Sequence, residues 1–233
     1  MRFGSLFSGI GGLDLGLERA GMECAWQVEI DDYCTRVLEK HWPDVPKYRD
    51  IKEVEILPYV DLVCGGFPCQ PTSIAGKKLW REDERWLWPE FFRIVRDIRP
   101  QFVLVENPPG IISRGIEDVT GDLASFGYCV EWDRLRASDF GAPHRRERTF
   151  FIAYPISAGL EGGVFSEASW TPLGEFASGS WWESGYKLPR VGDGIPDRVD
   201  RMRAIGNAVV PQVAQWIGER IIDFDKAYLA NER

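Results

Sequence analysis

Short apolar runs alternate with amphipathic stretches along most of the chain. Runs of strand length lie at residues 2–7, 24–30, 60–64, 102–105, 128–135 and 149–153. Helical periodicity is found at residues 13–20, 31–41, 87–98 and 213–224. Strands that are apolar throughout and alternate with helices indicate a parallel, doubly wound α/β sheet covered on both faces.

The regular pattern breaks after Tyr154. Residues 155–200 are rich in Gly, Ser, Pro and Trp and have only weak periodicity, which indicates a small irregular subdomain or a long surface insertion. Helical periodicity then returns toward the C-terminus. We therefore divide the chain into a main domain, residues 1–154 and 201–233, and a small region, residues 155–200.

A glycine-rich turn follows the first predicted strand. Gly9, Gly11 and Gly12 allow tight turning and a close approach of the backbone to a ligand. Glu29 ends the second strand, roughly 20 residues later, the spacing at which a carboxylate accepts hydrogen bonds from ribose hydroxyls. Together they predict a cofactor that contains adenosine. Asp50, with Ile51 after it, follows a third strand and is either a contact to the adenine edge or a local cap.

One thiol follows the apolar run at residues 60–64. Cys69 comes directly after Pro68, so it lies where a strand of the sheet meets a loop. Ligands of open α/β sheets bind beyond the carboxyl ends of the strands, which makes Cys69 a candidate nucleophile; the alternative is a core cysteine. A free thiol has a pKa of about 8.5, so a nucleophile here needs local positive charge.

Polar side chains also follow the next strand and precede a later one. Glu106 comes after residues 102–105 and is expected to share the sheet edge with Cys69. Thiolate attack at C6 of cytosine, with a proton delivered at N3, makes C5 reactive, and burial keeps a carboxyl group protonated for that task. The alternative for Glu106 is a surface ion pair. Arg146 and Arg148 would share a face if extended, and could hold the base, the thiolate or a phosphate; the alternative is a solvated charge run.

Together these segments resemble the cytosine-5 DNA methyltransferase family. The matching pieces occur in the family's order: Phe7-Ser8-Gly9-Ile10-Gly11-Gly12, Glu29, Asp50-Ile51, Gly65-Gly66-Phe67-Pro68-Cys69-Gln70-Pro71, Glu106-Asn107, Arg146-x-Arg148 and Gly206-Asn207-Ala208-Val209-Val210-Pro211. The resemblance covers residues 2–154 and 200–225. It implies a Rossmann-like fold and methyl transfer from S-adenosyl-L-methionine to C5 of a cytosine flipped out of double-stranded DNA.

The resemblance also implies residue roles. Cys69 would be the nucleophile, Glu106 the group at N3, and Arg146 and Arg148 contacts within the catalytic site. The cofactor site would be lined by Phe7, Gly9, Gly11, Gly12, Glu29, Ile30, Asp50, Ile51, Pro68 and Leu87, and closed from the C-terminal side by Asn207 and Ala208. Residues 155–200 would read the target. They are shorter than the family's usual recognition region, which suggests a short target, low stringency or help from a protein partner.

Charge changes the expectation about the substrate. The formal net charge is -8 and the pI is about 5.0, so a nucleic-acid enzyme would have to concentrate positive charge locally. The segment from Ala75 to Trp88 combines lysines and arginines with tryptophans, and its position after Cys69 predicts a mobile loop that closes over a flipped base. Arg198, Arg201 and Arg203 are further candidates for phosphate contacts.

Cysteine usage bears on the compartment and on metal binding. The five cysteines form no Cys-x-x-Cys pair and only two histidines are present, so we expect no metal site and a reduced, cytoplasmic protein, bacterial or phage-encoded. The chain shows no signal peptide and no apolar run of membrane-spanning length. We expect a monomer without membrane contact.

Three other functions compete with DNA methylation. The same chemistry on tRNA would use the same thiol and carboxyl group. A non-catalytic module that binds the cofactor or nucleic acid would lack that pair, and this chain has both residues. A nicotinamide-dependent oxidoreductase is disfavoured by the incomplete glycine fingerprint and by the thiol after proline.

Overall fold

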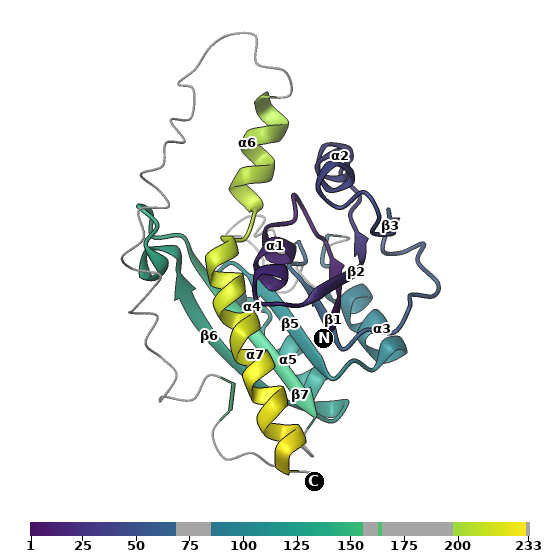
Figure 1. The fold of residues 1–233 in the computed structure, drawn as a ribbon, viewed down its shortest axis with the longest axis vertical. Helices are drawn as coiled ribbons and strands as arrows, with labels where there is room; N and C mark the ends of the chain where they lie inside the picture. Colours follow the sequence, from purple (N-terminus) through teal and green to yellow (C-terminus); the bar gives the residue numbers. More distant parts are fainter. Residues whose placement is uncertain (69–84, 156–162, 165–197, 232–233) are drawn as a thin grey trace.

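A single sheet forms the centre of the computed structural model, which describes residues 1–68, 85–155, 163–164 and 198–231 (Figure 1). Its strands are β1 (Arg2–Leu6), β2 (Glu23–Val28), β3 (Lys47–Tyr48), β4 (Leu62–Gly65), β5 (Phe102–Asn107), β6 (Tyr128–Arg136) and β7 (Glu147–Pro155). The strand order is β3-β2-β1-β4-β5-β7-β6. The predicted α/β class with a doubly wound, mostly parallel sheet is confirmed.

The strand order explains where a site can form. The chain runs outward from β1 through β2 to β3 and then crosses back to β4 and β5, all parallel. The connections after β1 and β4 therefore leave in opposite directions, and the carboxyl ends of strands at such a point are where ligands of open α/β sheets bind. The glycine turn follows β1, and the segment that leads to Cys69 follows β4.

The last two strands depart from the parallel pattern. β7 runs antiparallel to both β5 and β6. The chain between β6 and β7 holds only the 3-10 helix η1 (Ala137–Phe140) and a short turn. A parallel pair requires a crossover of a dozen or more residues, so this short connection forms a hairpin instead.

Helices cover both faces of the sheet. Apolar side chains of α1 (Gly12–Arg19), α2 (Asp32–His41) and α7 (Pro211–Asn231) share one core cluster with the sheet. Those of α3 (Trp88–Ile98), α4 (Ile111–Arg114) and α5 (Ile116–Ser125) share a second cluster on the other face. Burial on both faces accounts for the continuous apolar runs in the strands.

The C-terminal segment is locked against α1. A Cβ atom on Gly16 would lie 2.3 Å from Cβ of Ala214, and one on Gly12 would lie 2.3 Å from the carbonyl oxygen of Val209. Only glycine permits this approach. In Figure 1, α7 accordingly runs beside α1 across one face of the sheet. This packing brings a segment from the end of the chain next to the glycine turn.

A further helix, α6 (Arg198–Asn207), precedes α7 in the chain. In Figure 1 it lies past the N-terminal end of α7, away from the sheet. Arg203 of α6 pairs with Asp31, the residue that caps the N-terminus of α2. Helices α4, α5 and α6 were not predicted from the sequence. The second strand ends at Val28, two residues earlier than predicted.

Most of the region predicted as a separate unit, residues 155–200, lies outside the described residues. The described pair Gly163 and Val164 packs against the sheet, where Val164 is buried and its N–H donates to Glu131 Oε1 at 3.0 Å. The division of the chain into two units remains a prediction.

Candidate active site

Glu106 is the next-to-last residue of strand β5, and its carboxyl group is buried. The residue is 6% exposed, and Nε of Arg148 on the neighbouring strand β7 lies 2.9 Å from its Oε1 atom. Burial raises the pKa of the Glu106 carboxyl group to about 7, although Arg148 and Arg146 act in the opposite direction. The alternative interpretation of Glu106 as a surface ion pair is wrong, because its carboxyl group is buried against a partly exposed Arg148.

The segment that follows β4 is anchored to the end of β5. Gly65 of β4 pairs with Val105, and Nδ2 of Asn107 donates to the carbonyl oxygen of Phe67 at 3.3 Å. A Cβ atom on Gly66 would lie 2.6 Å from Glu106 Oε2. The chain thus passes directly against the carboxyl group of Glu106 just before Cys69. Cys69 itself lies outside the described residues.

Aromatic packing also holds the segment after β4 in place, through the ring of Phe67. Phe67 is buried and its ring lies edge-on to Trp86, with ring centroids 5.0 Å apart. Trp88 is also buried, begins α3, and donates from its indole nitrogen to Asp122 at 2.7 Å. The prediction of a mobile loop from Ala75 to Trp88 is therefore wrong at Trp88, which belongs to the core; residues 75–84 lie outside the described residues.

Arg146 and Arg148 point to different partners. Arg146 precedes β7 and has a φ of 27°, so the extended conformation on which the expected alternation with Arg148 depended is not adopted at that residue. Both guanidinium groups nevertheless act electrostatically on the carboxyl group of Glu106. The guanidinium group of Arg146 donates to the carbonyl oxygens of Gly206 at 2.7 Å and Ala208 at 2.5 Å. Arg146 therefore binds the end of α6 and the residue after Asn207.

The glycine turn after β1 adopts left-handed backbone conformations. Phe7, Gly9 and Gly11 have φ values of 54°, 57° and 80°. Such values favour glycine, and a phenylalanine there stores local strain of the kind found at ligand sites. Apart from its two chain neighbours, no described atom lies within 4 Å of the Cβ position of Gly9. Among the described residues, the turn therefore has open space beside it on that side.

Glu29 ties this turn to the second strand. It follows β2 directly, and its two carboxylate oxygens accept the N–H groups of Gly9 and Asp31, both at 2.7 Å. Burial raises the pKa of Glu29, while these two hydrogen bonds lower it. Each carboxylate oxygen can accept a further bond, so the predicted contact to a ribose hydroxyl remains open. The neighbouring Ile30 is 62% exposed.

The other predicted cofactor residues occupy the same edge of the sheet or adjoining segments. Asp50 follows β3, and its Oδ1 accepts the N–H of Lys52 at 2.9 Å, so it caps a local turn. Ile51 is buried. Three predicted residues flank described elements: Pro68 after β4, Leu87 at the N-cap of α3, and Asn207 at the end of α6.

Asp14 is a buried carboxyl group that the sequence analysis missed. It lies on α1 under the glycine turn and accepts hydrogen bonds from Ser5 Oγ at 3.0 Å and Gln27 Nε2 at 2.8 Å. Complete burial raises the pKa of Asp14 to about 6, against the lowering effect of both bonds. The available signal was its position on the apolar stripe that contains Leu13 and Leu17.

Residues 1–169 match the family model described as C-5 cytosine-specific DNA methylase. The Type II methyltransferase M.HgiCII of Herpetosiphon aurantiacus is 38% identical over 176 residues, which are 72% of this chain and 40% of that protein. M.HhaI of Haemophilus parahaemolyticus is 37% identical over 172 residues, 71% of this chain and 52% of that protein. The chain thus spans about half or less of the length of these relatives.

Solved structures show the same architecture. A prophage-encoded E. coli protein described as a DNA modification methyltransferase matches with a TM-score of 0.60 and 32% identity, over 70% of this chain and 49% of that one. The S. pombe Dnmt2 methyltransferase matches with a TM-score of 0.57 over 72% of this chain and 56% of that one; at 21% identity this match supports the fold alone. Within the described part of the chain, no helix combines the length and apolarity needed to cross a membrane.

Proposed function

The chain belongs to the C-5 cytosine-specific DNA methylase family, and from that membership we propose that it transfers a methyl group from S-adenosyl-L-methionine to C5 of cytosine in double-stranded DNA. The observation that carries the proposal is the buried carboxyl group of Glu106, whose pKa burial raises to about 7. It contacts the chain segment that leads to Cys69. A carboxyl group that is partly protonated at neutral pH can deliver a proton to a ring nitrogen.

In the proposed reaction, Cys69 and Glu106 act together on two atoms of the cytosine ring, C6 and N3. The Cys69 thiolate forms a bond to C6 of the cytosine while Glu106 donates its proton to N3. The displaced electron pair makes C5 nucleophilic, and C5 would take the methyl group of S-adenosyl-L-methionine, whose methyl–sulfur bond breaks so that S-adenosylhomocysteine leaves. Transfer of the C5 proton to water would then expel the Cys69 thiolate, and N3 would return its proton to Glu106.

The residues around the glycine turn fit S-adenosyl-L-methionine. The open space beside Gly9 leaves room for a ligand against the backbone. Glu29 retains acceptor capacity for ribose hydroxyls, and the exposed side chain of Ile30 offers an apolar surface to an adenine ring. When bound, the cofactor supplies an electrophilic methyl group on a sulfonium.

The two arginines take separate roles in this proposal. Arg148 orients the carboxyl group of Glu106 through their ion pair. Arg146 is a positioning residue: it holds the carbonyl groups on either side of Asn207, and thereby the segment that closes the cofactor site from the C-terminal side. Residues 155–200 would carry target recognition, alone or with a protein partner.

Transfer of a labelled methyl group from S-adenosyl-L-methionine tests the proposal directly. We expect incorporation into cytosine-containing duplex DNA and less into tRNA, with Cys69→Ser inactive but still able to bind S-adenosylhomocysteine. Duplex DNA that carries 5-fluorocytosine at the target should become covalently attached to the wild-type chain and not to Cys69→Ser. Preferential methylation of tRNA, or turnover by Cys69→Ser, would overturn the proposal.

A further inference from the structure

Arg49 holds a short stretch of backbone at one end of the sheet. It follows β3 directly, and Nη2 of its guanidinium group donates to the carbonyl oxygen of Ile30 at 2.6 Å. The same nitrogen contacts Oδ1 of Asp32, and Nη1 donates to Oγ1 of Thr35. One side chain therefore binds three points of the segment that leads from β2 into α2.

Thr35 extends this hold to two further carbonyl groups. A guanidinium group only donates hydrogen bonds, so the hydroxyl oxygen of Thr35 accepts from Arg49 and its own proton is directed to other acceptors. Oγ1 lies 3.2 Å from the carbonyl oxygen of Glu29 and 2.9 Å from that of Asp31, and the proton is shared between them. Arg49 and Thr35 together thus hold the carbonyl groups of three successive residues, 29 to 31.

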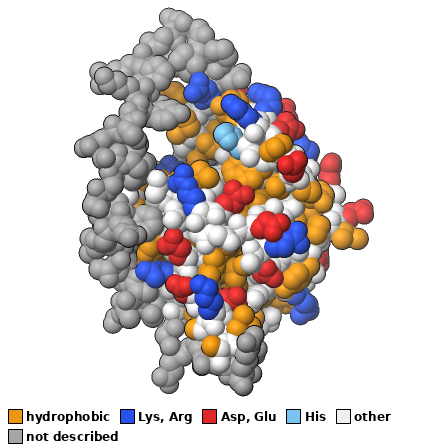
Figure 2. Space-filling view, viewed as in Figure 1, with side chains coloured by type: hydrophobic (Ala, Val, Ile, Leu, Met, Phe, Trp, Pro, Cys, Tyr) orange, Lys and Arg blue, Asp and Glu red, His pale blue; other side chains and the backbone are white. Residues whose placement is uncertain are grey.

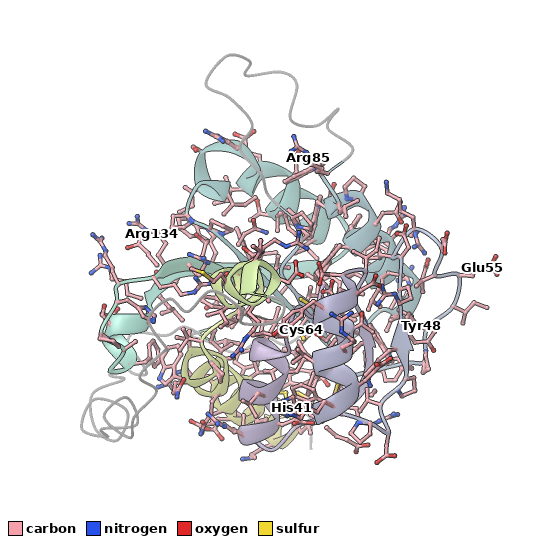
Figure 3. All side chains as sticks on the ribbon, turned by 90° about the horizontal axis from the view of Figure 1, so that it is seen from above. His41, Tyr48, Glu55, Cys64, Arg85 and Arg134 are labelled. Carbon is pink, nitrogen blue, oxygen red and sulfur yellow. The ribbon has the colours of Figure 1, made fainter. Side chains whose placement is uncertain are left out.

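The strand pairing of the sheet ends where this hold begins. β2 and β3 pair through Val28 and Tyr48, and the N–H of Glu29 donates to the carbonyl oxygen of Tyr48 at 2.9 Å. Arg49, one residue after Tyr48, continues the attachment with its side chain. β3 is an edge strand, and in Figure 3 Tyr48 lies toward the side of the molecule, whereas Cys64 of β4 lies near the middle. Arg49 therefore acts from the outer edge of the sheet.

The segment that Arg49 holds carries two residues proposed to contact the adenosine half of the cofactor. Glu29 connects the segment to the glycine turn through the N–H of Gly9, and Ile30 is 62% exposed. Because little protein packs against the Ile30 side chain, the backbone decides where that side chain points. Fixing the carbonyl group of Ile30 therefore fixes the apolar surface that Ile30 offers to a ligand.

An ion pair alone would not distinguish Arg49 from other arginines. On the face over α1 and α7, acidic and basic side chains of the described residues are interspersed among apolar ones (Figure 2). The side chain of Asp32 is 85% exposed, and a pair with so exposed a carboxylate contributes little. Arg49 differs in binding a backbone carbonyl beside the proposed ligand site. It also acts on Glu29: burial raises the pKa of Glu29, and Arg49 is among the groups that act in the opposite direction.

We propose that Arg49, acting through Thr35 and the backbone, is a positioning residue for the adenosine half of S-adenosyl-L-methionine. The assignment rests on the proposed function. Arg49 itself touches no ligand atom; it fixes the backbone that directs Glu29 at the ribose and Ile30 at the adenine ring. A segment that is ordered in advance avoids the cost of ordering on binding, so Arg49 raises affinity and leaves the chemical step unchanged.

Calorimetry with S-adenosylhomocysteine tests this role. Arg49→Gln removes the donors to Ile30 and Thr35, and we expect binding to weaken about 5- to 10-fold. The KM for S-adenosyl-L-methionine should rise by the same factor while kcat stays within about 2-fold. Arg49→Lys keeps the charge but not the planar fork, so its loss should be smaller. The control is Arg2→Gln, which removes the same charge from a side chain 52% exposed, against 42% for Arg49, and should bind normally.

Three further measurements locate the effect. 5′-Methylthioadenosine contains the adenosine half of the cofactor and lacks its amino-acid part, so Arg49→Gln should weaken its binding by the same factor. Thr35→Val removes the hydroxyl group at nearly constant volume and should weaken both ligands in the same direction. Asp32→Asn removes the carboxylate partner but keeps the bond from Arg49 to Ile30, and should change the affinity by less than about 2-fold.

The outcomes separate this inference from the proposed function. A wild-type chain that neither binds S-adenosylhomocysteine nor methylates DNA overturns the proposed function. A wild-type chain that binds S-adenosylhomocysteine, beside an Arg49→Gln variant of equal affinity, overturns the positioning role alone. The same holds if Asp32→Asn loses as much as Arg49→Gln, if the loss spares 5′-methylthioadenosine, or if the Tm falls while affinity is unchanged. If Arg49→Gln does not fold, Arg49→Lys and Thr35→Val decide by the same criteria.

Discussion

The carboxyl group of Glu106 and the guanidinium group of Arg148 form an ion pair across the antiparallel strands β5 and β7, with Nε 2.9 Å from Oε1. Two effects on the carboxyl group oppose each other. Burial raises its pKa and the arginine lowers it, and burial prevails, since the pKa lies at about 7. The pair therefore keeps a proton available at neutral pH and keeps the carboxyl group in one orientation.

The pH dependence of methyl transfer should reflect this carboxyl group. In the proposed reaction the protonated form of Glu106 is the active one, so kcat/KM should fall as the pH rises through about 7. Arg148→Gln should move this limb to higher pH, because the arginine lowers the pKa. Glu106→Gln should lower kcat/KM roughly 100-fold or more, and its kcat/KM should no longer fall as the pH rises through this range. A limb that Arg148→Gln leaves in place would show that another group titrates.

Gly66→Ala should damage catalysis without unfolding the protein. The added Cβ atom would lie 2.6 Å from Glu106 Oε2, so the carboxyl group has to move. A displacement of this size can lower kcat on the order of 100-fold. The matched control is Gly110→Ala, since no described atom lies within 4 Å of its Cβ position. Equal kcat values for the two variants would contradict the packing of Gly66 on Glu106.

Arg146→Gln should weaken cofactor binding more than it slows the bound complex. It removes donors to the carbonyl oxygens of Gly206 and Ala208. A charge-assisted hydrogen bond contributes about 1.5 to 3 kcal/mol, so we expect roughly 10-fold or greater loss of affinity for S-adenosylhomocysteine by calorimetry. Its neighbour Arg145 contacts Glu147 instead, and Arg145→Gln should bind the cofactor normally. Similar affinities for both variants would remove the positioning role.

Asp14→Asn should change how stability depends on pH. The folded-state pKa of Asp14 is raised from 3.8 to about 6, so its contribution is fully present below the unfolded pKa and is lost as the pH rises through about 6. Relative to Asp14→Asn, the wild-type free energy of unfolding should fall by about 3 kcal/mol between about pH 4 and 6. Urea denaturation at several pH values measures this, with the exposed loop variant Asp44→Asn as control. Parallel profiles for wild type and Asp14→Asn would show that Asp14 has no raised pKa.

Gly16→Ala should loosen the attachment of α7. The new Cβ atom would lie 2.3 Å from Cβ of Ala214 and 2.4 Å from the carbonyl oxygen of Pro211. Overpacking of this kind costs about 1 to 3 kcal/mol. Gly121→Ala in α5 meets no described atom within 4 Å and should instead add about 0.5 to 1 kcal/mol through helix propensity. Thermal unfolding should thus shift the Tm of the two variants in opposite directions.

Local pattern was sufficient for much of the fold. Strands β4 and β5 were predicted because each is buried on both faces and therefore mostly or wholly apolar. A tight turn after β1 was predicted because glycines permit it, and the backbone there is left-handed at Gly9 and Gly11. Helices α4 and α5 were missed, since α4 is a single turn and α5 carries charged residues among few apolar ones. That Glu106 and the segment before Cys69 lie at the same edge of the sheet could be predicted because β4 and β5 are parallel and both segments are at the carboxyl ends of these strands.

The sequence by itself determined which residues are proposed to carry the chemistry, because motif order and strand alternation are local properties of the chain. Only the tertiary structure decided which group each of those side chains contacts. Arg146 and Arg148 differ by two positions, yet one binds the end of α6 and the other Glu106, since a positive φ at Arg146 breaks the strand alternation. The tertiary structure likewise places Trp88 in the core and three arginines around Glu147, and burial raises the pKa of Glu106. Each outcome depends on burial and on neighbours distant in the chain, which no local pattern encodes.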